Sequence, residues 1–379
     1  MTARKVVSCC LPAVLSFTVL LTACGGGGST GGGTGGGGTN PPPNTANEWT
    51  WMGGSNTVNA VGVYGLKGVA SANNVPGARV SAVSWTDSSG NLWLFGGEHY
   101  DSTGATGELN DLWEFSPTTK EWTWVSGSNT VDATAVYGTQ GVASASNTPG
   151  AGEAGVGWTD SSGNLWLFGG DDYNDLWEFN TSTKEWTWIS GSSTANQPPV
   201  YGTQGVASAS NTPGAGWGTV GWTDSNGNFW FFGREGADVW KFSPISKEWT
   251  WVSGSSTGQQ PTVYGTQGVA SASSTPGERS ATVGWTDTSG NLWLYGGLNG
   301  TTGTTDLADL WKFNTSTKEW TWVGGSSKSD QLAVFGAQGV ASASNTPGGR
   351  YAAVGWTDSS GNFWLFGGIG GGNYSTGAL

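Results

Sequence analysis

One unit of about 70 residues recurs along most of this chain, and it constrains the fold more than any other feature. The segment "WTDSSGNLWLFGG" begins at Trp85, and variants of it begin at Trp158, Trp222, Trp285 and Trp356. Successive starts are 73, 64, 63 and 71 residues apart. A repeat of this kind indicates small modules that cannot bury their apolar faces alone and therefore stack on their neighbours.

Each of the first four units contains four segments with the pattern of short β-strands, which in the first unit are residues 79–85, 92–97, 111–115 and 121–125. Between the first two, "TDSSGN" predicts a hairpin, because Asp bonds the backbone ahead of it and Gly adopts positive φ. The high content of Gly (67) and Trp (25), with only 11% charged residues, also favours strands over helices. We therefore predict an all-β fold, a β-propeller of four-stranded antiparallel blades.

The Gly pair after the second strand, the following "DLW" and the Trp-bearing "EWTW" resemble the kelch repeat, in the form found in bacterial proteins related to the galactose oxidase propeller. The resemblance covers residues 48–379 and implies a kelch-type β-propeller with five recognisable blade repeats. The units exceed the usual kelch length of about 50 residues. The excess is a recurring loop before each first strand, which we expect to be ordered around one aromatic ring in each unit: Tyr64, Tyr137, Tyr201, Tyr264 and Phe335.

The two ends of the repeat region raise the question of ring closure. "EWTW" at residues 48–51 has no preceding strands, and the fifth unit ends after its second strand, without a "DLW". We expect residues 48–51 to supply the fourth strand of the last blade or to pair poorly at an open edge. Either the sequence is a truncated part of a six- or seven-bladed ring, or "NYSTGAL" near Leu379 closes five blades.

Residues 1–24 have the build of a bacterial lipoprotein signal peptide, with a short basic region, an apolar run and "LTAC" ending at Cys24. Residues 25–47 form a Gly/Pro-rich linker. We expect lipidation of Cys24 and an extracytoplasmic protein anchored to a bacterial membrane, with the outer membrane or cell surface favoured. All three Cys lie in residues 1–24, which excludes a disulfide framework in the fold.

The net charge and the number of His and Cys residues exclude some classes of function. The formal charge of −13 disfavours nucleic acid as a partner, and we expect a monomer without cofactors. A single His and no Cys after residue 24 exclude galactose-oxidase copper chemistry. The favoured interpretation is a non-enzymatic binding module for a glycan or protein ligand. The alternatives are a sugar-modifying, epimerase-like propeller enzyme and a purely structural surface protein.

In kelch propellers, partners bind where first strands begin and second strands end, and residues that differ between repeats there are the best candidates. We expect the repeated Trp residues to be core. Replacing Arg279 and Arg350 by Ala is expected to abolish binding without lowering the melting temperature. A weaker calcium candidate consists of Asp171, Asp172 and Asp175. The predicted ligand-binding residues are Arg79, Arg279, Arg350, Trp217, Arg234, Glu98, His99, Tyr100, Asp171, Asp172 and Tyr173.

Overall fold

The computed structural model describes residues 50–170, 172–216, 220–233, 237–258, 260–300 and 305–370. Within these ranges the chain forms 24 strands and no helix, and all strand pairs are antiparallel. The predicted all-β class is therefore confirmed. No helix in the described part is long and apolar enough to cross a membrane. The predicted signal peptide, the lipidation site Cys24 and the linker lie outside the described residues.

The strands fall into five repeat units. Unit one contains β1 (Arg79–Val80), β2 (Val83–Thr86), β3 (Leu92–Tyr100), β4 (Thr106–Ser116) and β5 (Glu121–Ser126). Unit two contains β6 (Val156–Thr159), β7 (Leu165–Gly170), β8 (Tyr173–Asn180) and β9 (Glu185–Ser190). Unit three contains β10 (Ala207–Ser208), β11 (Val220–Thr223), β12 (Phe229–Phe232), β13 (Val239–Ser243) and β14 (Glu248–Ser253).

Units four and five follow the same scheme, although unit five is shorter. Unit four contains β15 (Arg279–Ser280), β16 (Val283–Thr286), β17 (Leu292–Tyr295), β18 (Leu298–Asn299), β19 (Ala308–Asn314) and β20 (Glu319–Ser326). Unit five contains β21 (Arg350–Tyr351), β22 (Val354–Thr357), β23 (Phe363–Phe366) and β24 (Ile369–Gly370). Its described residues therefore hold the first two strands of the repeat and not the third or fourth.

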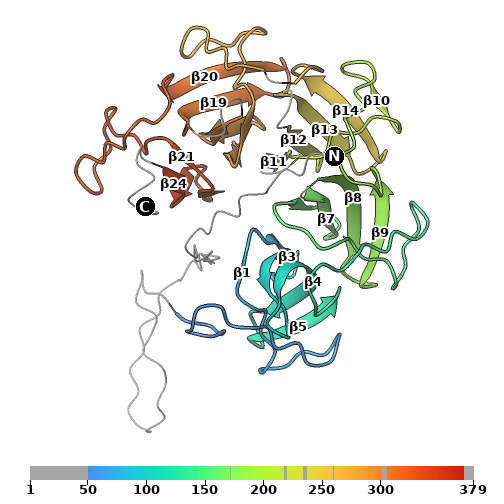
Figure 1. Ribbon diagram of the computed structural model, residues 1–379. Coiled ribbons are helices and arrows are strands. Elements are labelled where there is room, and N and C mark those ends of the chain that lie inside the picture. The colour runs from blue at the N-terminus through green and yellow to red at the C-terminus, as the bar shows by residue number, and fades with distance from the viewer. Residues whose placement is uncertain are drawn as a thin grey trace, which may run out of the picture.

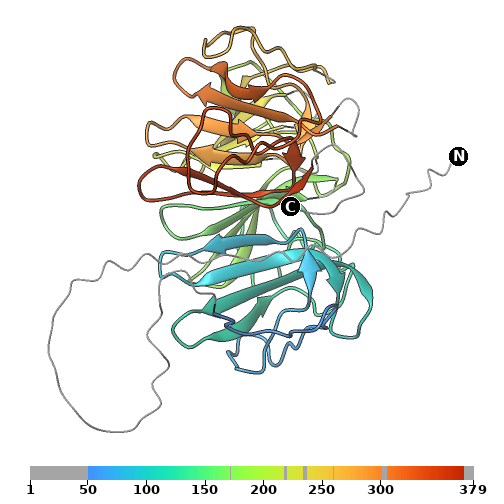
Figure 2. The ribbon, with the colours of Figure 1, turned by 90° about the vertical axis from the view of Figure 1, so that its left-hand side faces the viewer.

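The sheets of the five units follow one another around a common centre, in chain order, which gives a propeller-like arrangement (Figure 1). In units one to four the main sheet has the order first, second, third and fourth strand. The first strands β2, β6, β11, β16 and β22 contact one another in that sequence. The view in Figure 2, turned by 90°, shows successive sheets lying one above another.

The hydrophobic core lies between consecutive units, as the repeat predicts. Three buried clusters combine side chains of two neighbouring units, from the pair one and two to the pair three and four, and partly buried side chains of unit five pack against buried ones of unit four. The Trp of the third strand is 0% exposed in all four units that have one: Trp113, Trp177, Trp240 and Trp311. The predicted core role of these repeated Trp residues is confirmed.

A Gly in the first strand allows this close stacking. In unit two, a Cβ on Gly157 would lie 2.5 Å from the indole nitrogen of Trp85 in unit one. That nitrogen donates a hydrogen bond to the backbone oxygen of Trp166 at 3.0 Å. Since a side chain at Gly157 would displace the indole, the "VGW" Gly is required by contact between units.

The recurring loop before each first strand is ordered in units one to four, as expected. Its Tyr packs on two Trp rings of the same unit, as Tyr64 does on Trp113 and Trp124 at 4.8 and 5.1 Å. The loop also pairs with the outer edge of the fourth strand, through the bridge between Ser71 and Trp122 and through β10 on β14. The loop therefore covers a strand edge that would otherwise offer unpaired backbone groups.

Unit five is the exception. Its loop ring, Phe335, is 70% exposed, and Trp364 of β23 is 50% exposed. Residues 50–78 form no strand, and Trp51 is 65% exposed. Of the "EWTW" of residues 48–51, only Thr50 and Trp51 are described, and neither lies in a strand; Glu48 and Trp49 lie outside the described residues.

Candidate functional site

The Arg that follows "PG" forms a buried ion pair with the Asp of the third strand. In unit one, β1 directs Arg79 across the sheet to Asp111 of β4, and the two guanidinium nitrogens donate to the two carboxylate oxygens at 2.6 and 2.8 Å. Burial lowers the pKa of Arg79, but the carboxylate of Asp111 outweighs that effect and raises it. A two-point pair of this kind fixes both side chains.

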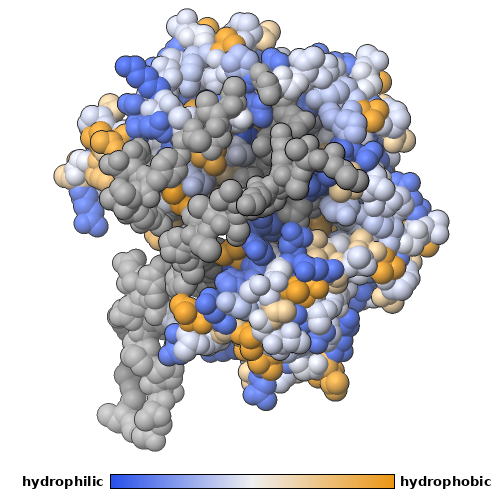
Figure 3. Space-filling view, in the orientation of Figure 1, coloured by the Kyte–Doolittle hydropathy of each residue, from blue (hydrophilic) through white to orange (hydrophobic). Residues whose placement is uncertain are grey.

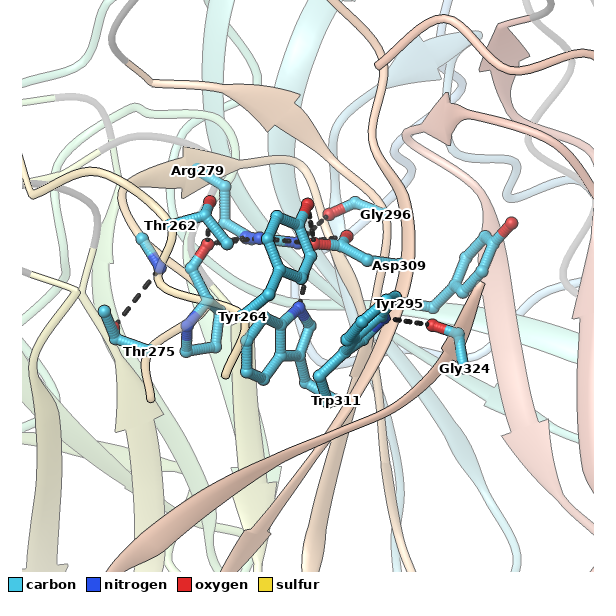
Figure 4. A network of polar contacts seen from close by, with 12 residues as sticks. Thr262, Tyr264, Thr275, Arg279, Tyr295, Gly296, Asp309, Trp311 and Gly324 are labelled. Atoms are coloured by element: carbon cyan, nitrogen blue, oxygen red, sulfur yellow. Dashed lines mark hydrogen bonds and ion pairs between the residues drawn. The ribbon is translucent and has the colours of Figure 1, made fainter. Parts of the chain in front are cut away.

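Unit four repeats this arrangement with complete burial (Figure 4). Arg279 and Asp309 both have 0% exposed side chains, and their two hydrogen bonds are 2.7 and 3.0 Å long. Arg279 also donates to the backbone oxygen of Gly296 at 3.0 Å and to that of Pro276. The guanidinium is therefore held by protein acceptors on several sides.

Two further donors converge on the same carboxylate. The hydroxyl of Tyr264 and the indole nitrogen of Trp311 donate to Asp309 at 3.0 and 2.8 Å, and the two rings stack at 5.4 Å (Figure 4). Burial, and then the negative charge of Asp309, raises the pKa of Tyr264. The network joins the loop, the first strand and the third strand of the unit.

These contacts correct two of the predicted ligand-binding residues. Arg79 and Arg279 were expected to face a partner, yet their side chains are 5% and 0% exposed and are paired with Asp. Arg350 is also largely buried, and its guanidinium donates to the backbone oxygens of Gly367 and Pro347. Because the ion pair of Arg279 is buried, we now expect Arg279→Ala to lower the melting temperature, in place of the unchanged value expected from the sequence.

Unit two keeps the Asp but has Gly152 in place of the Arg. Asp175 is buried and accepts hydrogen bonds from Tyr137 and Trp177, both at 2.8 Å. No described basic side chain forms an ion pair with it, and burial raises its pKa. Asp172 is exposed, and the described residues hold no group of three potential metal ligands, so they lend the calcium candidate no support.

A recess of about 340 Å³ lies beside the network in unit four. It opens where β17 and β20 end and β15 and β19 begin, at the end of the sheet that was expected to bind ligands. This volume is at the small end of the range for ligand sites. Most of the lining side chains are polar: Gln260, Pro261, Thr262, Tyr264, Glu278, Asn299, Leu307, Ser327 and Ser329.

Glu278 breaks the repeat at this recess. The other four units have Ala or Gly at the corresponding position, namely Ala78, Ala151, Ala215 and Gly349. Glu278 as a whole residue is 9% exposed, and burying a Glu carries a desolvation cost that stacking of the units does not require. Sequence reasoning missed this residue, although a comparison of the five repeats position by position would have found it.

The other predicted residues lie on corresponding ends of other units. In unit one, Glu98 is exposed, and His99 and Tyr100 are partly buried with their rings stacked at 4.2 Å. In unit two, Tyr173 is partly buried at the start of β8. None of these lines the recess in unit four. Trp217, Arg234 and Asp171 lie outside the described residues.

Comparison with solved structures shows a structural likeness. No protein-family model matches the chain, and no curated protein matches it. A solved structure, described as the structure of YjhT, is 16% identical, with a TM-score of 0.48 and 80% of each chain covered.

Proposed function

We propose that this chain is a kelch-type β-propeller whose five repeat units are blades. Four-stranded antiparallel sheets in chain order around a centre, with cores between neighbouring units, support this assignment. The Gly pair, "DLW" and "EWTW" of the sequence support the kelch type. The blade number and the mode of closure remain part of the proposal.

Within this fold, the proposed function is non-enzymatic binding of a glycan at the unit-four recess. The observation that supports it best is the replacement of a small residue by Glu278 beside Asn299 and Thr262, where other units have different residues. Carboxylate, amide and hydroxyl groups are the partners that sugar hydroxyls need, and Tyr264 adds an aromatic wall.

We also propose that the propeller lies outside the cytoplasm and is tethered to a bacterial membrane by a lipidated Cys24. The lipobox-like "LTAC" and the Gly/Pro-rich segment after it support this part. A tethered propeller would present its recess to glycans near the membrane surface.

A glycan array probed with the full chain in mild detergent tests the binding function. For a glycan retained on the array, Glu278→Ala is expected to weaken binding roughly 10- to 100-fold, which is the value of one hydrogen bond to a charged group. Ser246→Ala, in the exposed turn between β13 and β14, serves as the control because it lies at the opposite end of a sheet. Equal binding by the Glu278 variant would refute the site, and turnover of the glycan would favour an enzyme instead.

A further inference from the structure

At two boundaries between neighbouring units, a Lys of one unit pairs with a Glu of the unit before it. The Nζ atom of Lys184 in unit two lies 3.0 Å from the carboxylate of Glu114 in unit one. The Nζ atom of Lys247 in unit three lies 3.2 Å from the carboxylate of Glu178 in unit two. Lys184 also lies over the ring of Trp93, 4.4 Å from its centroid. These two boundaries are therefore joined by opposite charges at the turn end of the sheets, where third strands lead into fourth strands.

The boundary between units three and four has two positive charges at the same positions. Lys241 of β13 stands where units one and two have the Glu, and Lys318 of unit four keeps the position of Lys184 and Lys247. The ammonium groups of Lys241 and Lys318 lie 6.0 and 5.7 Å from the ring centroid of Trp230. Neither forms an ion pair with a described carboxylate. Because like charges this close repel each other, stacking of the units does not account for a Lys at this position.

The turn Asn at this boundary has also lost an acceptor. In unit one, the side-chain nitrogen of Asn91 donates to Glu114 at 3.1 Å, and unit two repeats this contact. In unit three, the side chain of Asn228 donates to the two oxygens of Asp224, at 3.3 and 3.0 Å. The Asp224 carboxylate also accepts the indole nitrogen of Trp230 at 2.8 Å and two backbone N–H groups of its own turn. Two ammonium groups and an amide thus lie at one boundary without the Glu carboxylate that the repeat provides.

An anion with several oxygen atoms matches these donors. Each ammonium group has three N–H donors and no acceptor. A phosphate monoester offers three acceptor oxygens and a charge of about −1.5 to −2 at pH 7. The formal charge of −13 disfavours a long polyanion at this site. On the face shown in Figure 3, the apolar residues are scattered in small groups among hydrophilic ones, so charge is a clearer basis for recognition than apolar area.

We propose that the boundary between units three and four binds the phosphate group of a phosphate monoester through Lys241, Lys318 and Asn228. The bound anion takes the role of the absent Glu carboxylate and joins the two units as the Lys–Glu pairs join the preceding ones. The site lies at the turn end of the sheets, opposite the unit-four recess, and does not depend on the proposed glycan binding.

Isothermal titration calorimetry of the full chain in mild detergent, at constant ionic strength, tests the site with inorganic phosphate and glucose 6-phosphate as probes. Saturable binding of at least one probe is expected. Tighter binding of glucose 6-phosphate supports an organic monoester as the ligand, whereas equal or tighter binding of inorganic phosphate would overturn that choice. Lys241→Gln and Lys318→Gln should each weaken binding roughly tenfold or more. Absence of binding by the wild type, or unchanged binding by both variants, would overturn the site.

Two further variants separate the site from misfolding and from general attraction to positive charge. Lys241→Glu restores the residue that units one and two have at this position, so the fold is retained. It should abolish binding of both probes, and phosphate should raise the melting temperature of the wild type but not of this variant. Lys247→Gln removes a Lys at the same end of the sheets that is already paired with Glu178, and it should leave binding unchanged. A loss as large as that of Lys318→Gln would contradict the assignment to this boundary.

Discussion

The contrast between unit four and unit two yields a paired prediction for two buried Asp residues. In Asp309→Asn, the amide would face the guanidinium of Arg279, whose side chain is 0% exposed. The buried positive charge then loses its counterion, which costs about 3–5 kcal/mol. At roughly 2 °C per kcal/mol for a domain of this size, the melting temperature should fall by about 6–10 °C.

Asp175→Asn is the matched substitution and should behave in the opposite way. Both donors of Asp175, Tyr137 and Trp177, reach the same oxygen, Oδ2, which an Asn side-chain oxygen can replace. The variant removes a buried charge that has no described cation beside it. Its free energy of unfolding at pH 7 should lie within about 1 kcal/mol of the wild type or above it.

Differential scanning calorimetry of the full chain at pH 7 compares the two variants with the wild type. The raised pKa of Asp175 adds a pH signature. The folded state holds this proton more tightly, so wild-type stability declines as pH rises from 3.8 through the folded pKa, and the Asn variant lacks that decline. Equal losses of stability in Asp309→Asn and Asp175→Asn would refute the counterion argument.

Three further predictions follow from individual contacts, and a fourth follows from the sequence of residues 1–24. Tyr264→Phe removes one hydrogen bond to a charged group and should lower the free energy of unfolding by about 1.5–3 kcal/mol in urea denaturation. Gly157→Ala forces a methyl group into the neighbouring indole and should lower the free energy of unfolding by about 1–3 kcal/mol. Gly53→Ala has open space around it and should lower the free energy of unfolding by less than about 0.5 kcal/mol. Equal losses in the two variants would argue against contact between units. Burial would raise the pKa of Asp287, but hydrogen bonds from neighbouring side chains outweigh this effect and lower the pKa. The stability that this group contributes is therefore present above pH 3.8 and is lost as pH falls through the folded pKa. Asp287→Asn should accordingly show a shallower acid unfolding transition by fluorescence. Cys24→Ser should abolish incorporation of labelled palmitate and release the chain from the membrane fraction; retention there would contradict the lipid anchor.

The repeat pattern predicted most of the fold because each strand carries its own local signal. Asp87 illustrates this: its carboxylate accepts the backbone N–H groups of Ser89 and Asn91, and Gly90 has a φ of 81°. Such a turn depends on residues adjacent in sequence, so it can be recognised without tertiary information. The core position of Trp113 and its counterparts also followed, because identical residues at one strand position imply identical packing.

The roles of Arg79 and Arg279 were not predictable in the same way. Each pairs with an Asp 32 or 30 residues further along the chain, across a sheet. Unit two retains Asp175 without an Arg, so the two residues do not occur together in every repeat. An Arg that differs between repeats therefore has the pattern of a ligand-binding residue, although burial makes it structural in units one and four.

Glu278 is the opposite case, because the sequence analysis did not select it as a ligand-binding residue and the structure does. Its burial beside Asn299 depends on how the loop before β15 meets the end of β20, which no local pattern specifies. The sequence does show that a small residue in four units has become a Glu in one. Comparison of aligned repeats thus detects the candidate, but the structure is needed to place it in a recess.

A crystal structure of the full chain bound to a glycan selected on the array tests the proposed binding site most directly. The account predicts sugar density in the unit-four recess, with hydroxyl groups within hydrogen-bond distance of the carboxylate of Glu278 and the amide of Asn299. Density in unit one, against Glu98, His99 and Tyr100, with an empty unit-four recess would contradict it.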